Sequence, residues 1–288
     1  MQNSLAPDVM FPNLGIQIAN LPRTAFYLFG ISVYWYGILI TLGVLCGVLY
    51  AYFEAKRTGQ NPETYLDFAA IVIVTSIIGA RIYYVIFSWD IYRNNIPSIF
   101  NPRLGGLAIY GAIIAAIITA YLFSKIKKLE FPIVFDTCVP GLVIGQAIGR
   151  FGNFFNREAF GGYTDSLFAM RYLAIDVPRI PAEVSQNMIF FDGMYYIQVH
   201  PTFLYEAIGC ILIFIFLNVY KAHKKFDGEM FLIYLIGYGF IRAIIEGMRT
   251  DQLLLWGTDM AVSQILSVIA AVFGVGMLVW IRRKVRST

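Results

Sequence analysis

The polar segment 149–162 contains the residues of this chain whose types and spacing best suit a chemical site. One of its two arginines, Arg150, offers a planar guanidinium that can bind a phosphate through two hydrogen bonds, and its two asparagines offer amide donors and acceptors. Its glutamate adds a carboxylate, and its glycines allow the backbone to approach a ligand closely. The alternative is an ordinary helix terminus followed by a turn, but that would not require so many polar groups beside an apolar segment. The segment therefore predicts a ligand site built from Arg150, Asn153, Asn156, Glu158 and Gly161.

A second group of charged residues has helical spacing in the sixth apolar segment. Arg242, Glu246 and Arg249 follow one another at intervals of four and three, so a helix would bring them onto one face. Charged groups inside apolar segments are costly, and each is therefore a candidate for function. The alternative is that Glu246 only neutralises its two arginine neighbours, because buried charges are normally paired. The spacing is compatible with both roles.

Four further side chains are candidates that also have a structural explanation. Arg81 and Tyr110 both stand beside glycines, and the phenol of Tyr110 could enter a cavity or join the aromatic belt at the membrane surface. Tyr36, at the start of the first apolar segment, has the same two possibilities. His200 has Glu206 nearby as a possible partner for its ring, although a lone histidine is more often structural than catalytic.

The composition is that of a chain solvated by lipid. Of 288 residues, 58% are hydrophobic and only 14% are charged, whereas a soluble domain has about 25% charged residues. A soluble core of this length would still need a charged surface. The cysteines, Cys46, Cys138 and Cys210, have neither CxxC nor histidine-rich spacing and predict no metal site or disulfide framework. No cofactor is expected.

Seven apolar segments have the length of a membrane-spanning helix, which needs about 20 residues. The sequence thus predicts an all-α multi-pass protein with a single membrane domain, residues 1–288. Residues 160–201 lose the apolar runs and alternate polar with apolar side chains, so we expect them to form a small, partly β-structured cap outside the bilayer. Residues 1–30 predict a second outer element, and residues 282–288 a cytoplasmic tail. The predicted spans are 31–53, 66–88, 106–124, 132–149, 203–220, 229–248 and 260–281.

The basic residues divide between the two sides of the membrane. Every lysine lies in or beside the connections that follow the first, third, fifth and seventh segments, together with four of the arginines. By the positive-inside rule these connections face the cytoplasm, so the amino terminus is outside and the carboxyl terminus inside. All remaining basic residues are arginines, whose fork suits phosphate and carboxylate. The outer half is therefore equipped to hold oxyanions, although several of these arginines could simply meet lipid headgroups.

These residues resemble the signature of the bacterial phosphatidylglycerol:prolipoprotein diacylglyceryl transferases. The pattern Gly-Arg-x-Gly-Asn-Phe-x-Asn-x-Glu-x-x-Gly stands here as residues 149–161. Further blocks similar to those of the family occur in the family's order, and the seven-span topology with an outer amino terminus agrees. They are residues 34–37, 79–81, 105–111, Asp136, 200–206 and 238–249.

The resemblance implies a reaction and roles for the candidate residues. The family moves the diacylglyceryl group of phosphatidylglycerol onto the lipobox cysteine of a preprolipoprotein, in the bacterial cell membrane, without a metal, a cofactor or nucleic acid. A thioether forms and glycerol 1-phosphate leaves. We accordingly predict catalytic roles for Arg242, Tyr110, Glu246 and His200. The residues predicted to bind substrate are Arg150, Asn153, Asn156, Glu158, Gly161, Tyr36, Arg81 and Arg249.

The group that removes the thiol proton stays open. Some family members carry a histidine where this chain has Tyr110, followed by a glycine where it has Ala112. A tyrosine phenol is a poor base near neutral pH unless neighbouring cations lower its pKa. Our hypothesis is that Arg242 or a nearby phenol lowers the pKa of the thiol, and that Tyr110 hydrogen-bonds the substrate.

Two other classes of protein compete with the transferase. A transporter or channel could line an ion path with Arg242, Glu246 and Asp136, but it would need polar residues at several depths. The arginines instead gather toward the predicted outer ends of the spans, and only Asp136 lies deeper. A purely structural membrane scaffold would leave the polar segment 149–162 without an explanation.

Overall fold

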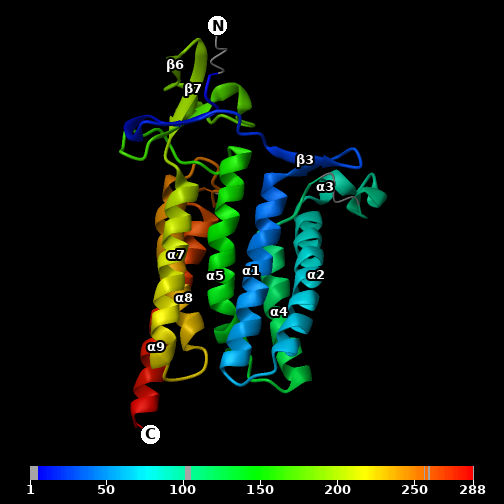
Figure 1. Cartoon of the computed structure of the whole chain (residues 1–288). Coiled ribbons are helices and arrows are strands. Elements are labelled where there is room, and N and C mark those ends of the chain that lie inside the picture. The colour runs from blue at the N-terminus through cyan, green and yellow to red at the C-terminus, as the bar shows by residue number, and fades with distance from the viewer. Residues whose placement is uncertain (1–5, 101–104, 256, 259, 288) are drawn as a thin grey trace. The chain divides into compact units, whose positions relative to one another are not determined.

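The computed structural model describes residues 6–100, 105–255, 257–258 and 260–287, and within them seven helices are long and apolar enough to cross a membrane (Figure 1). The protein is a multi-pass membrane protein, as the sequence predicted. It forms two compact units, Met1–Gly47 with Val139–Thr288, and Val48–Cys138. The seven helices are α1 (Trp35–Arg57), α2 (Pro62–Phe87), α4 (Ile109–Lys127), α5 (Phe131–Asn156), α7 (Thr202–Tyr220), α8 (Glu229–Met248) and α9 (Val262–Ser287).

Two helix boundaries differ from the predicted spans in a way that matters for the site. Helix α1 begins at Trp35 and not at residue 31, because Ile31–Tyr34 is a strand, β4. Helix α5 runs to Asn156, beyond the predicted end at residue 149. The first half of the polar segment 149–162 therefore lies on the last turns of a helix, and only its second half is a turn.

A five-stranded antiparallel sheet belongs to the first unit. Its strand order is β2-β1-β5-β7-β6, and the first two strands come from the amino terminus. The sequence placed residues 1–30 and 160–201 in two elements, whereas the structure joins them in one sheet because Val9 pairs with Tyr172. The strands are β1 (Val9–Phe11), β2 (Ile16–Ile18), β5 (Met170–Leu173), β6 (Ile189–Phe191) and β7 (Met194–Val199).

The core of this sheet region is apolar and closed. Val9, Met170, Tyr172 and Ile197 have almost no exposed surface, and Phe154 at the end of α5 packs against them. Burial of such side chains is the main favourable contribution to folding, at about 25 cal/mol per Å² of apolar surface. Because Phe154 belongs both to this core and to α5, the core fixes the end of α5. The region's short helices are η1 (Pro12–Leu14), η4 (Ala174–Asp176) and α6 (Ala182–Ser185).

A separate hairpin of β3 (Thr24–Leu28) and β4 leads into α1. Its turn residues, Phe29 and Gly30, both have positive φ, at 49° and 78°. Two positive values in a two-residue connection match the right-handed twist of the flanking strands. At the base, the Trp35 amide donates to the Arg23 carbonyl over 3.0 Å, so the hairpin is joined to the first turn of α1.

Helices α1 and α5 touch through glycines within the first unit. A Cβ on Gly43 would lie 2.8 Å from the Gly145 carbonyl oxygen, and a Cβ on Gly47 would lie 2.9 Å from that of Gly141. Each helix thus presents two glycines four residues apart, the spacing that lets membrane helices approach closely. Nearer the sheet, a Cβ on Gly152 would lie 2.7 Å from Cδ2 of Tyr36. This contact places the Tyr36 ring against α5 beside the polar segment.

Helices α7, α8 and α9 complete the first unit. An apolar cluster that includes Cys210, Leu217, Met230 and Tyr234 joins α7 and α8 to α5. Glu229 is the first residue of α8, and its fully buried carboxylate lies 2.6 Å from Nη2 of Arg282 on α9. The short helix η5 (Lys221–His223) follows α7.

The second unit contains the remaining parts of α1 and α5 with α2 and α4. Helices α2 and α4 pack through Gly79, on which a Cβ would lie 2.7 Å from the carbonyl oxygen of Gly111. Just before α2, Gln60 donates its side-chain amide to the hydroxyl of Thr137 on α5 over 2.9 Å. The short helices α3 (Trp89–Tyr92) and η2 (Ile96–Phe100) follow α2.

Candidate functional site

Two arginines from different helices converge on one carboxylate of α7. Glu206 Oε1 lies 2.6 Å from Nη2 of Arg150, and its Oε2 lies 3.0 Å from Nη1 of Arg242. The Tyr238 hydroxyl donates to Oε1 over 2.9 Å. The Glu206 side chain is 2% exposed, and those of Arg150 and Arg242 are 21% and 15% exposed. Because these charge-assisted hydrogen bonds are largely buried from solvent, they fix the two guanidiniums with respect to each other.

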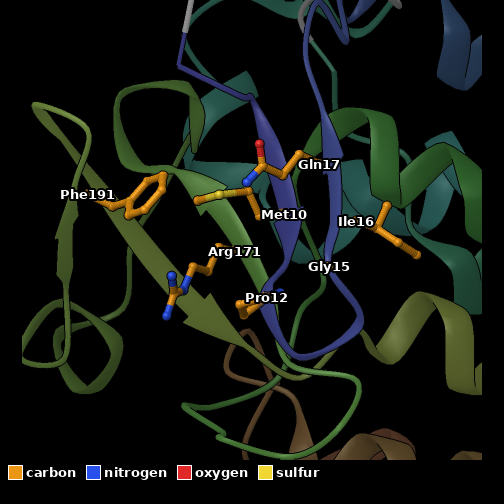
Figure 2. Close-up of a pocket in the computed structure, with 7 residues that line it drawn as sticks. All are labelled: Met10, Pro12, Gly15, Ile16, Gln17, Arg171 and Phe191. Atoms are coloured by element: carbon orange, nitrogen blue, oxygen red, sulfur yellow. The ribbon is translucent and has the colours of Figure 1, made fainter.

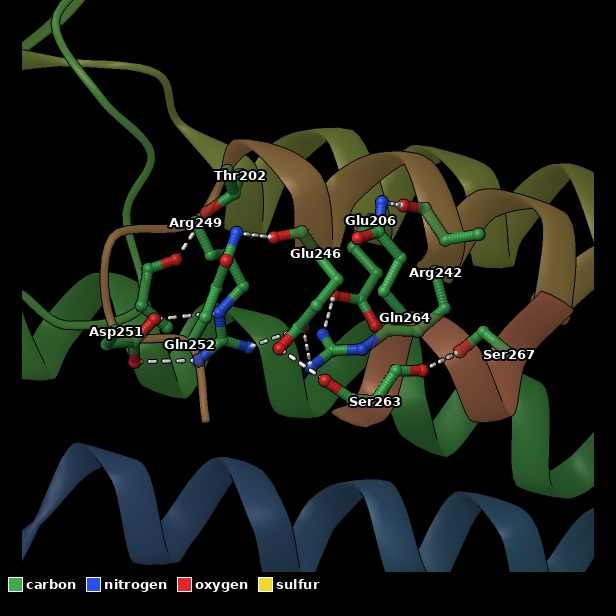
Figure 3. Close-up of polar contacts among 12 residues, drawn as sticks. Thr202, Glu206, Arg242, Glu246, Arg249, Asp251, Gln252, Ser263, Gln264 and Ser267 are labelled. Atoms are coloured by element: carbon green, nitrogen blue, oxygen red, sulfur yellow. Dashed lines mark hydrogen bonds and ion pairs between the residues drawn. The ribbon is translucent and has the colours of Figure 1, made fainter. Parts of the chain in front are cut away.

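The ion pairs continue from Arg242 to the end of α8 (Figure 3). Nη2 of Arg242 lies 2.5 Å from Oε2 of Glu246, and Nη1 of Arg249 lies 4.0 Å from the same oxygen. Arg249 then holds Asp251 through two hydrogen bonds of 2.9 and 2.7 Å. Ser263 of α9 donates to the other oxygen of Glu246. We call the series Arg150, Glu206, Arg242, Glu246, Arg249 and Asp251 the arginine–carboxylate ladder.

The local sequence explains the ladder on α8. The intervals of four and three residues bring Arg242, Glu246 and Arg249 together, as predicted, and the helix ends at Met248 so that Arg249 lies just beyond it. Burial by itself would raise the pKa of Asp251, but the hydrogen bonds and charge of Arg249 outweigh it and lower that pKa. Burial opposes the charge of Arg249, and Asp251 and Glu246 nevertheless raise its pKa. Glu246 does neutralise its neighbours, which does not exclude a chemical role.

The polar segment at the end of α5 is organised around Glu158. Asn153 and Asn156 each donate a side-chain amide to Oε1 of Glu158 over 3.1 Å. The Glu158 amide donates to the Asn153 carbonyl, and Arg157 between the helix and Glu158 has a φ of 55°, which is the backbone pattern of a Schellman helix end. Nη1 of Arg150 donates to Oδ1 of Asn153 over 3.5 Å. The segment and the ladder are thereby one continuous polar site.

Arg157, the second arginine of this segment, has a structural role. Its side chain is 4% exposed and lies 3.5 Å from Asp8 and 3.2 Å from Asp176. It also donates to the carbonyl of Leu21 over 2.8 Å. These partners come from the amino-terminal segment and the sheet region, so Arg157 ties both to the end of α5. A buried arginine of this kind needs its paired carboxylates.

Gly161 lies where three backbone segments meet. Its amide donates to the His200 carbonyl over 3.0 Å, and it forms an isolated bridge with Arg249. A Cβ there would lie 2.8 Å from Cβ of His200 and 2.9 Å from the carbonyl oxygen of Met248. A side chain would therefore push the turn away from the end of α8. Glycine at this position holds the polar segment against the ladder.

His200 differs from its predicted environment. Its Nδ1 lies 3.4 Å from the Tyr205 hydroxyl. Glu206, suggested by the sequence as its partner, instead contacts Arg150, Arg242 and Tyr238, because one turn into α7 its side chain points to α5 and α8. Burial lowers the pKa of His200, so the ring is neutral at neutral pH.

A family model and individual relatives of known name both match this sequence. The model of the prolipoprotein diacylglyceryl transferase family matches residues 23–280. The phosphatidylglycerol–prolipoprotein diacylglyceryl transferase of Listeria welshimeri is 43% identical over 271 residues, 94% of both chains. The enzymes of the same name from Finegoldia magna and Clostridioides difficile are 44% and 41% identical, over 88% and 92% of this chain and 94% and 97% of theirs. The chain belongs to this family.

The prolipoprotein diacylglyceryl transferase signature, residues 149–161, can now be read in physical terms. Arg150 is the first member of the ladder, the asparagines at the end of α5 hold Glu158 beside it, and Gly161 closes the junction with α8. Two residues of the site were missing from the predicted set. Glu206 had been considered only as a partner of His200, and Tyr238 only as part of a block. A carboxylate inside an apolar run was itself a usable signal.

Two predicted residues, Arg81 and Tyr110, lie in the second unit. Arg81 donates to the backbone carbonyls of Ser98, Ile99 and Gly106 over 2.8–3.0 Å, so it joins η2 to the residue stretch that enters α4. The ring of Tyr110 lies 6.4 Å from that of Tyr83 between centroids, at the first turn of α4. The substrate roles of both residues stay predictions.

A small hollow on the sheet shares no residue with the ladder. It has a volume of about 200 Å³ and is lined by residues of β1, β2, β5 and β6 with the turn after η1, including Met10, Gln17 and Arg171 (Figure 2). Ligand pockets usually have about 300–1,000 Å³. Within the described residues, no group of three or more histidines, cysteines or acids could hold a metal ion.

Proposed function

We propose that this protein transfers the diacylglyceryl group of phosphatidylglycerol to the thiol of a prolipoprotein's lipobox cysteine. The product is a thioether, and glycerol 1-phosphate leaves. The observation that carries the proposal is the convergence of Arg150 and Arg242 on a single anionic group at one end of apolar helices. The names of the relatives, which the chain matches over nearly its whole length, supply the substrates.

The chemistry needs an anchored phosphate and a thiolate. The sulfur attacks the glycerol carbon that carries the phosphate, and the carbon–oxygen bond breaks with its electrons going to the phosphate. Arg150 and Arg242 bind the phosphate and stabilise the charge that grows on it, which is worth most in a dry site. Glu246 and Arg249 orient Arg242 through the contacts described above.

The remaining predicted residues border the lipid and the peptide in this proposal. Asn153 and Asn156 at the end of α5 accept the headgroup together with Glu158 and Gly161 of the turn that follows. Tyr36 borders the acyl chains where it packs on α5. Arg81 and Tyr110 also bind substrate in this proposal, with Tyr110 as a hydrogen-bond donor. His200, neutral at neutral pH, is available to exchange a proton.

We further propose that the protein spans the cell membrane of a bacterium with its amino terminus outside and its carboxyl terminus in the cytoplasm. Each connection predicted to be cytoplasmic carries the lysines, for example Lys125 at the end of α4 and Lys224 after α7. The sheet region and the ladder then share the outer side, because β7 leads directly into the end of α7 that carries Glu206. There the site meets the lipid headgroups and the peptide substrate.

The test is a reconstituted reaction. The purified protein in lipid nanodiscs is incubated with phosphatidylglycerol and a lipobox peptide, and mass spectrometry measures the modified peptide and glycerol 1-phosphate. We expect both products with the parent, and a loss of about 100-fold or more in Arg150→Ala, comparable to removing one donor to a developing anion. Arg93→Ala removes an exposed arginine and serves as the matched control. Absence of both products from the parent would contradict the proposal.

A further inference from the structure

Glu206 occupies the place that the proposed function assigns to the lipid phosphate. Its carboxylate lies between the guanidiniums of Arg150 and Arg242, and each arginine bonds a different oxygen. A phosphodiester is also a monoanion that presents two oxygens to such donors. The two anions cannot both lie between the arginines in this arrangement. Substrate binding therefore has to displace the carboxylate.

The net charge of the ladder couples the displacement of Glu206 by the phosphate to the uptake of a proton. Three arginines face three carboxylates, so their formal charges cancel before substrate arrives. A phosphodiester would add one negative charge, and the departing phosphate monoester would add a second during the reaction. Uncompensated charge at this depth is costly. A proton taken up by one carboxylate offsets one of these two charges.

We propose that Glu206 holds the two arginines for the lipid phosphate and, once displaced, accepts the proton of the lipobox thiol. This inference rests on the proposed function. The thiol S–H bond breaks and its proton joins Glu206. The sulfur electrons then form the bond to the glycerol carbon, and the carbon–oxygen bond breaks with its electrons going to the phosphate. Glycerol 1-phosphate or solvent finally takes the proton from Glu206, which returns to the arginines.

We call Arg150 and Arg242 together the arginine clamp. This order of reaction steps strengthens the binding of the phosphate by the clamp while the negative charge on the phosphate grows. While Glu206 is ionised it competes with the phosphate for Arg150 and Arg242. After protonation it no longer competes, and the phosphate's charge then grows from one to two. Interactions that strengthen on the way to the transition state are those that accelerate a reaction.

The other groups near Glu206 are less suited to the role. Tyr238 donates its hydroxyl to Glu206 and is a phenol, and Cys210 is a buried thiol one turn further along α7. Glu246 is shared among Arg242, Arg249 and Ser263, whereas Glu158 is held by two asparagines and contacts no arginine in the described structure. Among the residues that the structure describes, Glu206 alone forms ion pairs with both Arg150 and Arg242.

The experiment compares Glu206→Gln with Glu229→Gln in nanodiscs. Glu229 is an equally buried carboxylate, and it is paired with Arg282. Its hydrogen-bond partner Tyr220 lies on α7 fourteen residues after Glu206, which is about 21 Å along the helix. For Glu206→Gln we expect kcat to fall by about 100-fold or more, the usual contribution of a general base. The KM for phosphatidylglycerol should stay the same or decrease, because a neutral amide no longer competes. Glu229→Gln should keep the parent's kcat.

A second substrate separates proton transfer from a structural role. A lipobox peptide with selenocysteine carries a selenol that is already ionised at neutral pH and needs no base. It should restore most of the turnover of Glu206→Gln, or of Glu206→Asp if the glutamine variant does not fold. Full activity of Glu206→Gln with the cysteine peptide would overturn the inference. A raised KM without rescue by selenocysteine would do the same, because it would assign Glu206 to building the clamp alone. If the parent protein itself made no product, the result would contradict the proposed function and not only the role of Glu206.

Discussion

At the scale of single residues, Gly161 allows a sharp test of how the site is assembled. Gly161→Ala would place a methyl group 2.8 Å from Cβ of His200 and 2.9 Å from a backbone oxygen of α8. We expect a lower melting temperature, corresponding to about 1–3 kcal/mol for an overpacked position, together with lower activity. The neighbouring Gly162→Ala meets only Glu183 Oε1 at 3.4 Å and should be close to the parent. Equal melting temperatures for the two variants would contradict this account.

His200 predicts a pH dependence of stability. Burial lowers its pKa below the ordinary value of 6.5, so the unfolded chain takes up a proton at a higher pH than the folded protein does. The folded state is therefore favoured above about pH 6.5 and loses this contribution as pH falls through the lowered pKa. We expect the parent to lose more of its melting temperature between pH 7.5 and 5.5 than His200→Gln does. Identical losses in thermal scans would show that His200 does not titrate differently on folding.

The site was predictable to the extent that its residues carry a local signal. Arg242, Glu246 and Arg249 could be grouped because a helix places intervals of three and four on one face, and the contacts confirm the grouping. Glu206 could not be assigned to Arg150, because that pair joins α5 to α7 and depends on how two distant segments pack. Sequence neighbours instead suggested His200 as its partner.

At the scale of elements, the α1–α5 contact is the feature most open to test. Gly145→Val would bring two methyl groups against the backbone of α1, where even a Cβ lies 2.9 Å from an oxygen. We expect the helices to separate and the Tyr36–Gly152 contact to loosen, which lowers both melting temperature and transferase activity. Gly276→Val on α9 is the matched control, since nothing lies within 4 Å of its Cβ. The account fails if Gly145→Val melts and reacts like the control.

Some helices and strands could be predicted from the pattern of neighbouring residues, and others could not. Hydropathy predicted all seven long helices, because lipid requires an uninterrupted apolar run. It placed the start of α1 too early, since the apolar strand Ile31–Tyr34 continues the same run. The three-residue strands β1 and β2 escaped prediction because β1 joins the sheet by pairing with β5, far away in the sequence, and β2 in turn pairs with β1.

At the scale of the whole molecule, the testable feature is orientation in the membrane. Seven spans place the termini on opposite sides, and the lysine-rich connections assign the carboxyl terminus to the cytoplasm. A fluorescent protein fused to the carboxyl terminus should therefore fluoresce in cells, and alkaline phosphatase fused there should be inactive because it needs the oxidising exterior to form its disulfides.

The opposite side can be tested at the turn between β6 and β7. Asp192 and Gly193 form an exposed turn with positive φ at both residues, which makes it a tolerant point of insertion. Alkaline phosphatase inserted there should be active. The reverse pattern, an inactive insertion with an active carboxyl-terminal fusion, would place Arg150 and Glu206 on the cytoplasmic side. The clamp would then face the inner leaflet, and the thiol of a translocated prolipoprotein could not reach it.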